Sequence, residues 1–151
     1  MYTLVRRFIK TAVAFLGVGL ALGLWMMGRR ELSDRYPSPY AVSAHTHAVF
    51  VGFVMLMIMG VALWLFPRPE KDDGRYSPRA AEAAYWLATL GTAGRVVGEL
   101  LRVAVDSAWL RWAVVCFGAA QVAGIGVFFY TIWSRIRPLG SKAREARGEK
   151  F

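Results

Sequence analysis

The sequence holds few of the side chains from which catalytic sites and disulfide frameworks are usually built. Its 151 residues include a single cysteine, Cys116, and two histidines, His45 and His47. One cysteine excludes a disulfide within the chain, and so few cysteines and histidines exclude a zinc site of the finger type. No Ser/His/Asp set that would indicate a hydrolase is found either.

Acidic residues are also scarce, and three long stretches contain no charged residue. Asp and Glu number 10 against 19 Lys and Arg, so the formal net charge is +9, yet 56% of the residues are hydrophobic. The uncharged stretches cover residues 11–28, 42–66 and 112–133. At about 1.5 Å per residue, each is long enough to cross or nearly cross a hydrocarbon core of roughly 30 Å. This pattern excludes an ordinary soluble domain and predicts transmembrane helices.

A fourth stretch, residues 80–104, is similarly long and apolar but contains charged residues. Glu82 lies near its start, and Arg95, Glu99 and Arg102 follow further along. We expect this stretch to form a helix with a polar face turned towards a cavity, a partner or a cofactor, because ionisable residues are costly in lipid.

These four stretches predict an all-α integral membrane four-helix bundle. The transmembrane domain covers residues 1–134, and a basic cytoplasmic tail, expected to be disordered or to lie on lipid headgroups, covers 135–151. Two glycine pairs, Gly19-x-x-x-Gly23 and Gly94-x-x-x-Gly98, predict close packing between helices. The spans are expected at about 11–28, 42–66, 80–104 and 110–133.

The cations predict the orientation of the bundle. The N-terminal segment, the loop after residue 66 and the tail hold most of the Lys and Arg, whereas the opposite loops hold only Arg29, Arg30, Arg35 and Arg111. The positive-inside rule therefore predicts that both termini are cytoplasmic, in a bacterial-type inner (plasma) membrane. Topology and anionic lipid explain the basic excess, so no nucleic-acid partner is predicted.

The two histidines lie at the mouth of the second span, in the segment AVSAHTHAVFVGF (41–53). Helical residues two positions apart point to nearly opposite sides, since successive residues turn by about 100°. His45 shares its stripe with Val49, Gly52 and Leu56, and Gly52 leaves a gap through which the edge of a macrocycle can approach the backbone. The pattern favours His45, with His47 less favoured, as an axial ligand of haem iron.

The polar face of the third span lies at the same predicted depth as His45. Arg95, Glu99 and Arg102 recur at i, i+4 and i+7, and basic residues there would meet the two propionates of a haem. A self-contained Arg95–Glu99 salt bridge that holds helices together is the alternative, and the two interpretations are compatible.

The segment HTHAVFVGFVMLMIMGVALWLFPR, residues 45–68, resembles the second transmembrane helix of haem-copper oxidase subunit I. It is most similar to C-type oxidases, nitric oxide reductases and small stand-alone relatives. The resemblance puts His45 in the place of the ligand to haem b. The further histidines that this family uses for a second axial ligand, a high-spin haem and copper or non-haem iron do not exist here, so one chain cannot reduce oxygen to water.

With His45 as the one assigned ligand, three coordination states stay open. The distal face of the haem is vacant, or a histidine from another copy binds it, or Met55, Met59 or Cys116 does. Five-coordination favours binding of a small gas, nitric oxide or oxygen, and six-coordination favours electron transfer near the outer membrane face. We expect a homo-oligomer, because one small bundle offers thin cover for a haem, and a respiratory-chain partner and haem-dependent oxidoreductase activity stay open.

Two other functions compete with this prediction. In the first, His45, His47 and the methionines of the segment MLMIM (55–59) bind copper, although methionines at i and i+2 cannot all face one side of a helix. In the second, the protein is an accessory subunit of a respiratory complex that holds no cofactor. A visible spectrum distinguishes all three.

Overall fold

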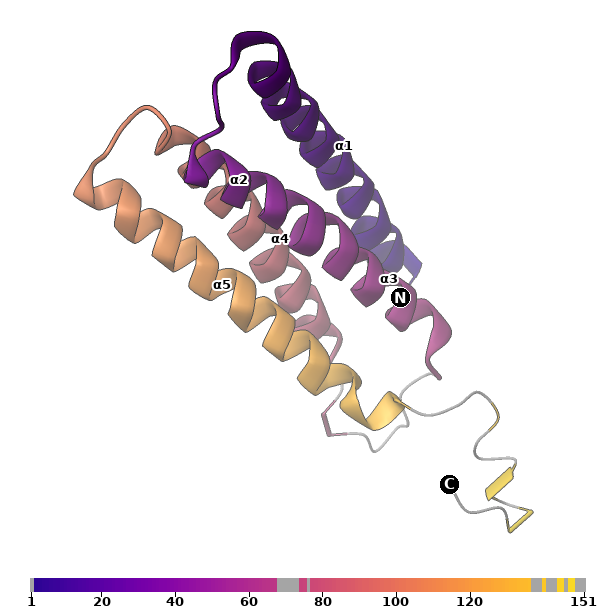
Figure 1. Cartoon of the computed structure of the whole chain (residues 1–151). Coiled ribbons are helices and arrows are strands. Elements are labelled where there is room, and N and C mark those ends of the chain that lie inside the picture. Colours follow the sequence, from indigo (N-terminus) through magenta and orange to yellow (C-terminus); the bar gives the residue numbers. More distant parts are fainter. Residues whose placement is uncertain are drawn as a thin grey trace.

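The computed structural model describes residues 2–67, 74–75, 77–136, 140, 144–145 and 147–148, and these form helices and turns with no strand among them. Four helical arms run back and forth along the bundle (Figure 1). The first arm is α1 (Tyr2–Ser33), and the second consists of α2 (Pro39–Thr46), the π-helix η1 (His47–Met55) and α3 (Leu56–Leu65). The third is α4 (Pro78–Leu101), and the fourth is α5 (Ala108–Ile132) with the short 3₁₀ turn η2 (Trp133–Arg135). The predicted all-α, four-helix architecture is confirmed.

Three of the four arms have the length and composition of membrane spans. They are Thr3–Ser33, Pro39–Leu65 and Ala108–Arg135, and they match the spans predicted from the uncharged stretches. The third arm differs because its charged residues lower its hydropathy, although at 24 residues α4 is long enough to cross a bilayer. It also ends earlier than predicted: Leu101 is its last helical residue, and the chain turns at residues 102–104.

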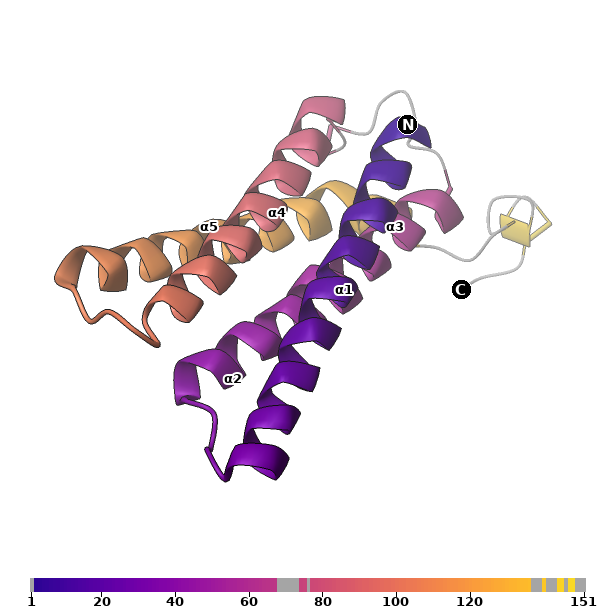
Figure 2. The ribbon, with the colours of Figure 1, turned by 90° about the horizontal axis from the view of Figure 1, so that it is seen from above.

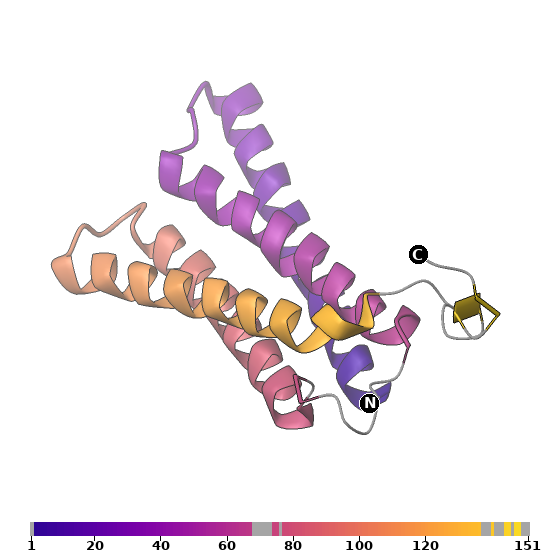
Figure 3. The ribbon, with the colours of Figure 1, turned by 90° about the horizontal axis from the view of Figure 1, so that it is seen from below.

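The arms form two hairpins that meet along α4. Figures 2 and 3 show α1 beside the α2–η1–α3 arm, and α4 beside α5. α4 also contacts α2 and η1, whereas α5 packs mainly against α4. Gly91 allows α4 and α5 to pack closely, because a Cβ atom there would lie 2.5 Å from the Gln121 nitrogen and 2.8 Å from the Phe117 oxygen. α4 is therefore the central helix of the described structure.

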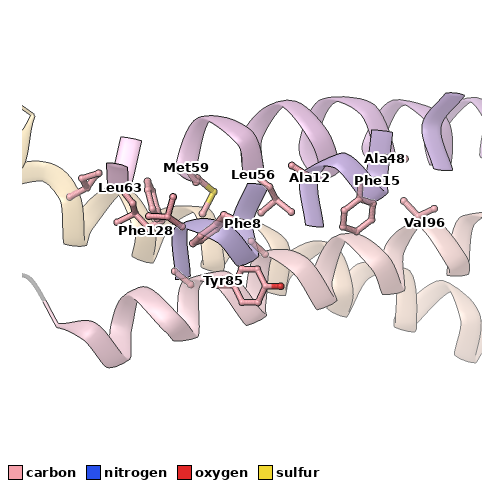
Figure 4. Close-up of a cluster of buried hydrophobic side chains, with 14 of the residues drawn as sticks. Phe8, Ala12, Phe15, Ala48, Leu56, Met59, Leu63, Tyr85, Val96 and Phe128 are labelled. Atoms are coloured by element: carbon pink, nitrogen blue, oxygen red, sulfur yellow. The ribbon is translucent and has the colours of Figure 1, made fainter. Parts of the chain in front are cut away.

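Aromatic side chains fill the half of the bundle near the start of α1. Phe8 of α1 is fully buried, with ring centroids 5.0 Å from Tyr85 of α4 and 5.8 Å from Phe128 of α5, both edge to face (Figure 4). The Tyr85 hydroxyl lies 2.8 Å from the Thr11 hydroxyl, which satisfies both groups. This half is held together by packing, with Met59 of α3 buried in the same cluster.

Polar side chains satisfy backbone groups at the helix ends. Ser38 and Ser77 cap α2 and α4 by accepting from backbone N–H groups three residues on, and a proline follows each cap. Arg135 is buried and donates to the Pro67 oxygen, at 2.7 Å, just past the end of α3. A buried guanidinium is well placed there, because carbonyl groups at a helix C-terminus lack intrahelical partners.

Candidate functional site

The His45 side chain lies against α1. Its Nδ1 atom is 2.9 Å from the Gly19 oxygen, and the imidazole is half-buried. A carbonyl oxygen can only accept, so Nδ1 carries the hydrogen and donates it. In a neutral imidazole the proton on Nδ1 leaves Nε2 with a free lone pair, which is the form that binds a metal ion. The ring also lies close to the backbone of Gly23, where a Cβ atom would be 3.1 Å from Cε1.

The stripe predicted for His45 continues along the same contact with α1. A Cβ atom at Gly19 would overlap the Val49 side chain, and one at Gly52 would overlap the ring of Phe15 from α1. Leu56, one turn further, is fully buried. The structure corrects the sequence-based expectation that Gly52 leaves open space beside its helix, because the Phe15 ring fills that space. The missing side chain at Gly52 lets an aromatic ring of the neighbouring helix approach.

His47 lies on the other side of the second arm, as its position two residues after His45 predicts. Its Nδ1 is 2.8 Å from the oxygen of Ser43, one turn earlier on the same arm, and donates to it. The same nitrogen is 3.4 Å from Oε2 of Glu99 on α4. The two histidines therefore face different neighbours, and within one copy they do not converge on one ion.

Glu99 is the centre of a buried ionic cluster that joins three elements. Its side chain is 5% exposed, and Oε1 accepts from the Ser43 hydroxyl at 2.9 Å and from Arg95 Nε at 3.0 Å. The Oε2 atom is buried and has no hydrogen-bond partner within the described part of the chain. The Arg95 side chain extends towards α5, where a Cβ atom at Gly118 would be 3.4 Å from Nη1. The salt bridge considered as an alternative from sequence is present in the structure.

Arg102 has different partners from Arg95. Its Nη2 donates to the Tyr40 hydroxyl at 2.7 Å, and its guanidinium lies 4.2 Å from the centroid of the Tyr40 ring. Asp106, 3.7 Å from Arg102 Nη2, receives hydrogen bonds from Arg111. Those hydrogen bonds, together with attraction to Arg111 and Arg102, hold the pKa of Asp106 below its ordinary value. This cluster ties α2 to the turn between α4 and α5.

The structure thus divides the predicted site residues between two faces of the second arm. Those on the α1 side are His45, Val49, Gly52 and Leu56. On the other side, His47 faces α4, which itself carries Arg95 and Glu99 and ends in the C-cap residue Arg102. Sequence reasoning took Ser43 for a helix cap and missed its hydrogen bond to Glu99; the cap of α2 is Ser38. It also missed the Gly19 carbonyl, for which the Gly19-x-x-x-Gly23 pair was a signal of close approach.

The sulfur ligands left open by the sequence lie away from His45 within one copy. Met55 and Met59 are further along the arm by roughly 15 and 20 Å at about 1.5 Å per residue, too far to reach the other side of the same iron. Met59 is moreover fully buried in the aromatic cluster, and Cys116 is exposed on α5. Among the described residues, no group of three or more His, Cys, Asp or Glu side chains could hold a metal ion.

Comparison with known proteins adds one finding. The family model described as Cytochrome C and Quinol oxidase polypeptide I matches residues 3–144, a range that includes all four helical arms. No curated protein and no solved structure matches the chain.

Proposed function

Since the chain belongs to the cytochrome c and quinol oxidase polypeptide I family, we propose that it is a membrane haem b protein in which His45 is an axial ligand of the iron. Proteins of this family bind haem, and three arms of this chain have the character of membrane spans. The proposal assigns the haem to the face of the second arm that carries His45.

One observation carries the proposal: His45 donates Nδ1–H to the Gly19 carbonyl and keeps the Nε2 lone pair. A histidine that binds a metal ion normally donates its other ring N–H to an acceptor, which fixes the ring and makes the ligating nitrogen more basic. The 2.9 Å contact supplies that acceptor from a different helix. The donor chemistry of His45 therefore fits the role of an axial ligand.

The neighbouring residues fit a haem on one condition. Val49 and Gly52 would contact the ring, but Val49 packs against Gly19 and the Phe15 side chain lies over Gly52, while Leu56 is fully buried further along the arm. Haem contact at Gly52 therefore requires Phe15 to adopt another rotamer. When bound, a haem supplies reversible one-electron chemistry or a site for a diatomic gas, and the apolar side chains of this face keep water away.

Arg95, Glu99 and Arg102 take part in the proposal through the oligomer. Nε of Arg95 donates to Glu99, and the described residues provide no acceptor for the terminal nitrogens of Arg95. These nitrogens suit a propionate. Because His45 faces α1 and Arg95 lies on the other side of the second arm, a single copy does not bring both to one ring. We therefore propose that Arg95 and Arg102 of one copy meet the propionates of a haem held by a second copy, in a homo-oligomer.

The proposed topology places the histidines near the outer face. Figure 1 shows the start of α1 and the end of α5 at one end of the bundle, and the turns after α1 and α4 at the other. The first end carries a group of cations that the positive-inside rule assigns to the cytoplasm: Arg6, Arg7, Lys10, Arg79 and Arg135. His45, near the other end, would bind nitric oxide or oxygen, or pass electrons to a respiratory-chain partner, close to the outer face of a bacterial-type inner membrane.

The test is a visible spectrum of the full chain, expressed in a host that makes haem and purified in detergent. We expect a Soret band and stoichiometric haem b, and a shift of the band on adding nitric oxide if the distal face is vacant. An unchanged band would indicate six-coordination and electron transfer. A colourless protein that retains copper would overturn the proposal in favour of copper binding, and a colourless protein without metal would favour a cofactor-free accessory subunit.

A further inference from the structure

The contact between His45 and α1 has a feature that is absent at His47. The His47 ring donates to the Ser43 oxygen of its own arm, so this hydrogen bond does not depend on another helix, although Glu99 of α4 lies 3.4 Å away. The His45 ring is held by an oxygen of another helix, and its orientation depends on how closely α1 approaches. Figure 2 shows α1 and the second arm side by side along their length.

Two glycines one turn apart on α1 make this approach possible. In the regular α-helix, the Gly19 oxygen accepts from the N–H of Gly23, four residues on. Its second lone pair accepts the Nδ1–H of His45. At Gly23 the imidazole lies directly on the helix, because even a methyl group there would be 3.1 Å from Cε1 and 3.5 Å from Nδ1. Carbon atoms at rest approach to about 3.5–4.0 Å, so an alanine at position 23 requires the ring or α1 to shift by a few tenths of an ångström, which strains the contact with the Gly19 carbonyl.

We infer that α1 positions the axial ligand: the Gly19 carbonyl fixes the Nδ1–H tautomer and the angle of the His45 ring, and Gly23 keeps that carbonyl within reach. Provided that His45 binds iron, as proposed above, Gly19 and Gly23 set the affinity and the electronic properties of the haem without touching it. They are positioning residues. Loss of such a partner of a ligating histidine lowers metal affinity by roughly 10-fold to 100-fold.

The substitution that tests this role is Gly23→Ala, and α1 offers a matched control. Gly17 is on the same helix and has nothing within 4 Å of the position of a Cβ atom, so Gly17→Ala brings the same change in helix propensity without a contact. We expect Gly23→Ala to weaken haem binding by roughly 10-fold. The haem that remains should show a shifted midpoint potential and an altered electron paramagnetic resonance spectrum. Gly17→Ala should match the wild type in all three measurements, and both variants should keep wild-type helicity by circular dichroism.

A second measurement needs no haem and no substitution on α1. In haem-free protein labelled with ¹⁵N-histidine, nitrogen chemical shifts distinguish the Nδ1–H tautomer from the Nε2–H tautomer. The variant His47→Gln retains His45 as its single histidine, so every labelled signal then belongs to His45. We expect the Nδ1–H tautomer at neutral pH. The Nε2–H tautomer would overturn the role of the Gly19 carbonyl, whether or not Gly23→Ala folds.

The outcomes separate the two proposals. If the wild type holds no haem, the proposed function fails, and the nitrogen signals alone still decide whether Gly19 orients His45. If the wild type holds haem and Gly23→Ala matches Gly17→Ala in affinity, potential and spectrum, α1 does not position the ligand, and the haem assignment itself stands.

Discussion

His45 and His47 are two residues apart on one arm, and the structure gives them different surroundings. His45 rests on two glycines of α1, with its Nδ1–H on the Gly19 carbonyl. His47 lies beside Glu99 in a cluster that also takes in Ser43 and Arg95. Both rings donate Nδ1–H to a backbone carbonyl, so they differ in the neighbouring element: a buried carboxylate of α4 lies beside His47, and the backbone of α1 lies beside His45. The comparison shows that the neighbouring helix, more than the residue type, determines the surroundings of each histidine.

The largest expected effect is the loss of haem when one of the two histidines is replaced. His45→Ala should abolish haem binding, because it removes the one nitrogen positioned for iron on the α1 side. His47→Ala should retain haem, with at most a shifted spectrum, because its contacts are to Ser43 and Glu99. Haem-to-protein ratios of the two purified variants decide. Equal loss in both would show that ligands come from both faces of the arm.

The ionic side of the comparison predicts an effect on stability. Glu99→Leu should destabilise the bundle by about 2 to 3 kcal/mol, since the carboxylate accepts from Ser43 and Arg95 and its loss leaves Arg95 unpaired at membrane depth. Glu82→Leu is the matched control, because its ion pair with Arg7 is half exposed and such pairs contribute about 0 to 1 kcal/mol. Thermal unfolding in detergent measures both. A larger loss in the control would contradict the role of the buried cluster.

The same cluster has a second readout, haem affinity. If Arg95 meets a propionate in the oligomer, Arg95→Leu should weaken haem binding by roughly 1 to 3 kcal/mol, the cost of losing a charge-assisted hydrogen bond. The double variant Arg95→Leu/Glu99→Leu removes the pair together and should regain part of the stability but not the haem affinity. Haem titrations that match the wild type in all variants would assign the cluster to helix packing alone.

The α1 side of the comparison is tested at Gly52. Gly52→Leu should cost about 1 to 2 kcal/mol by overpacking, because the added side chain would overlap the Phe15 ring. Adding Phe15→Ala should relieve the overlap and restore stability but not haem, since leucine then fills the room beside the arm. Phe15→Ala alone should bind haem more tightly than the wild type. Unchanged haem affinity in both the double variant and Phe15→Ala would place the ring elsewhere.

The sequence predicted the parts of the structure that depend on one helix at a time. Uncharged stretches located three spans, and helical periodicity put His45 and His47 on opposite sides and grouped Val49, Gly52 and Leu56 with His45. These features follow from helix geometry and from the cost of charge in lipid. The charged third stretch was recognised as a helix by the same reasoning.

Contacts between helices were beyond such reasoning. The helical periodicity of the second arm shows that a side chain is missing at Gly52 on the His45 side. It does not show that Phe15 of α1 fills the space. The same limit applies to Glu99, whose partner Ser43 is 56 residues away in sequence. The π-helical geometry of His47–Met55 also has no signal in the residue pattern, because no proline or repeated glycine marks it. Such contacts depend on the angle and rotation at which two helices meet.

The smallest expected effect concerns the turn between α4 and α5, where Arg102 and Arg111 flank Asp106. The pKa of Asp106 is held below its ordinary value, so the folded protein favours the charged carboxylate more than the unfolded chain does. Its stabilising effect is therefore present at neutral pH and is lost as the pH falls below about 4, through the pKa of the folded state. Asp106→Asn should slightly lower the thermal unfolding midpoint at pH 7, and the difference from the wild type should shrink as the pH falls below about 4. A difference that persists at acid pH would show that the asparagine disturbs the turn itself, and the ion pairs would then contribute nothing to holding α4 against α2 and α5.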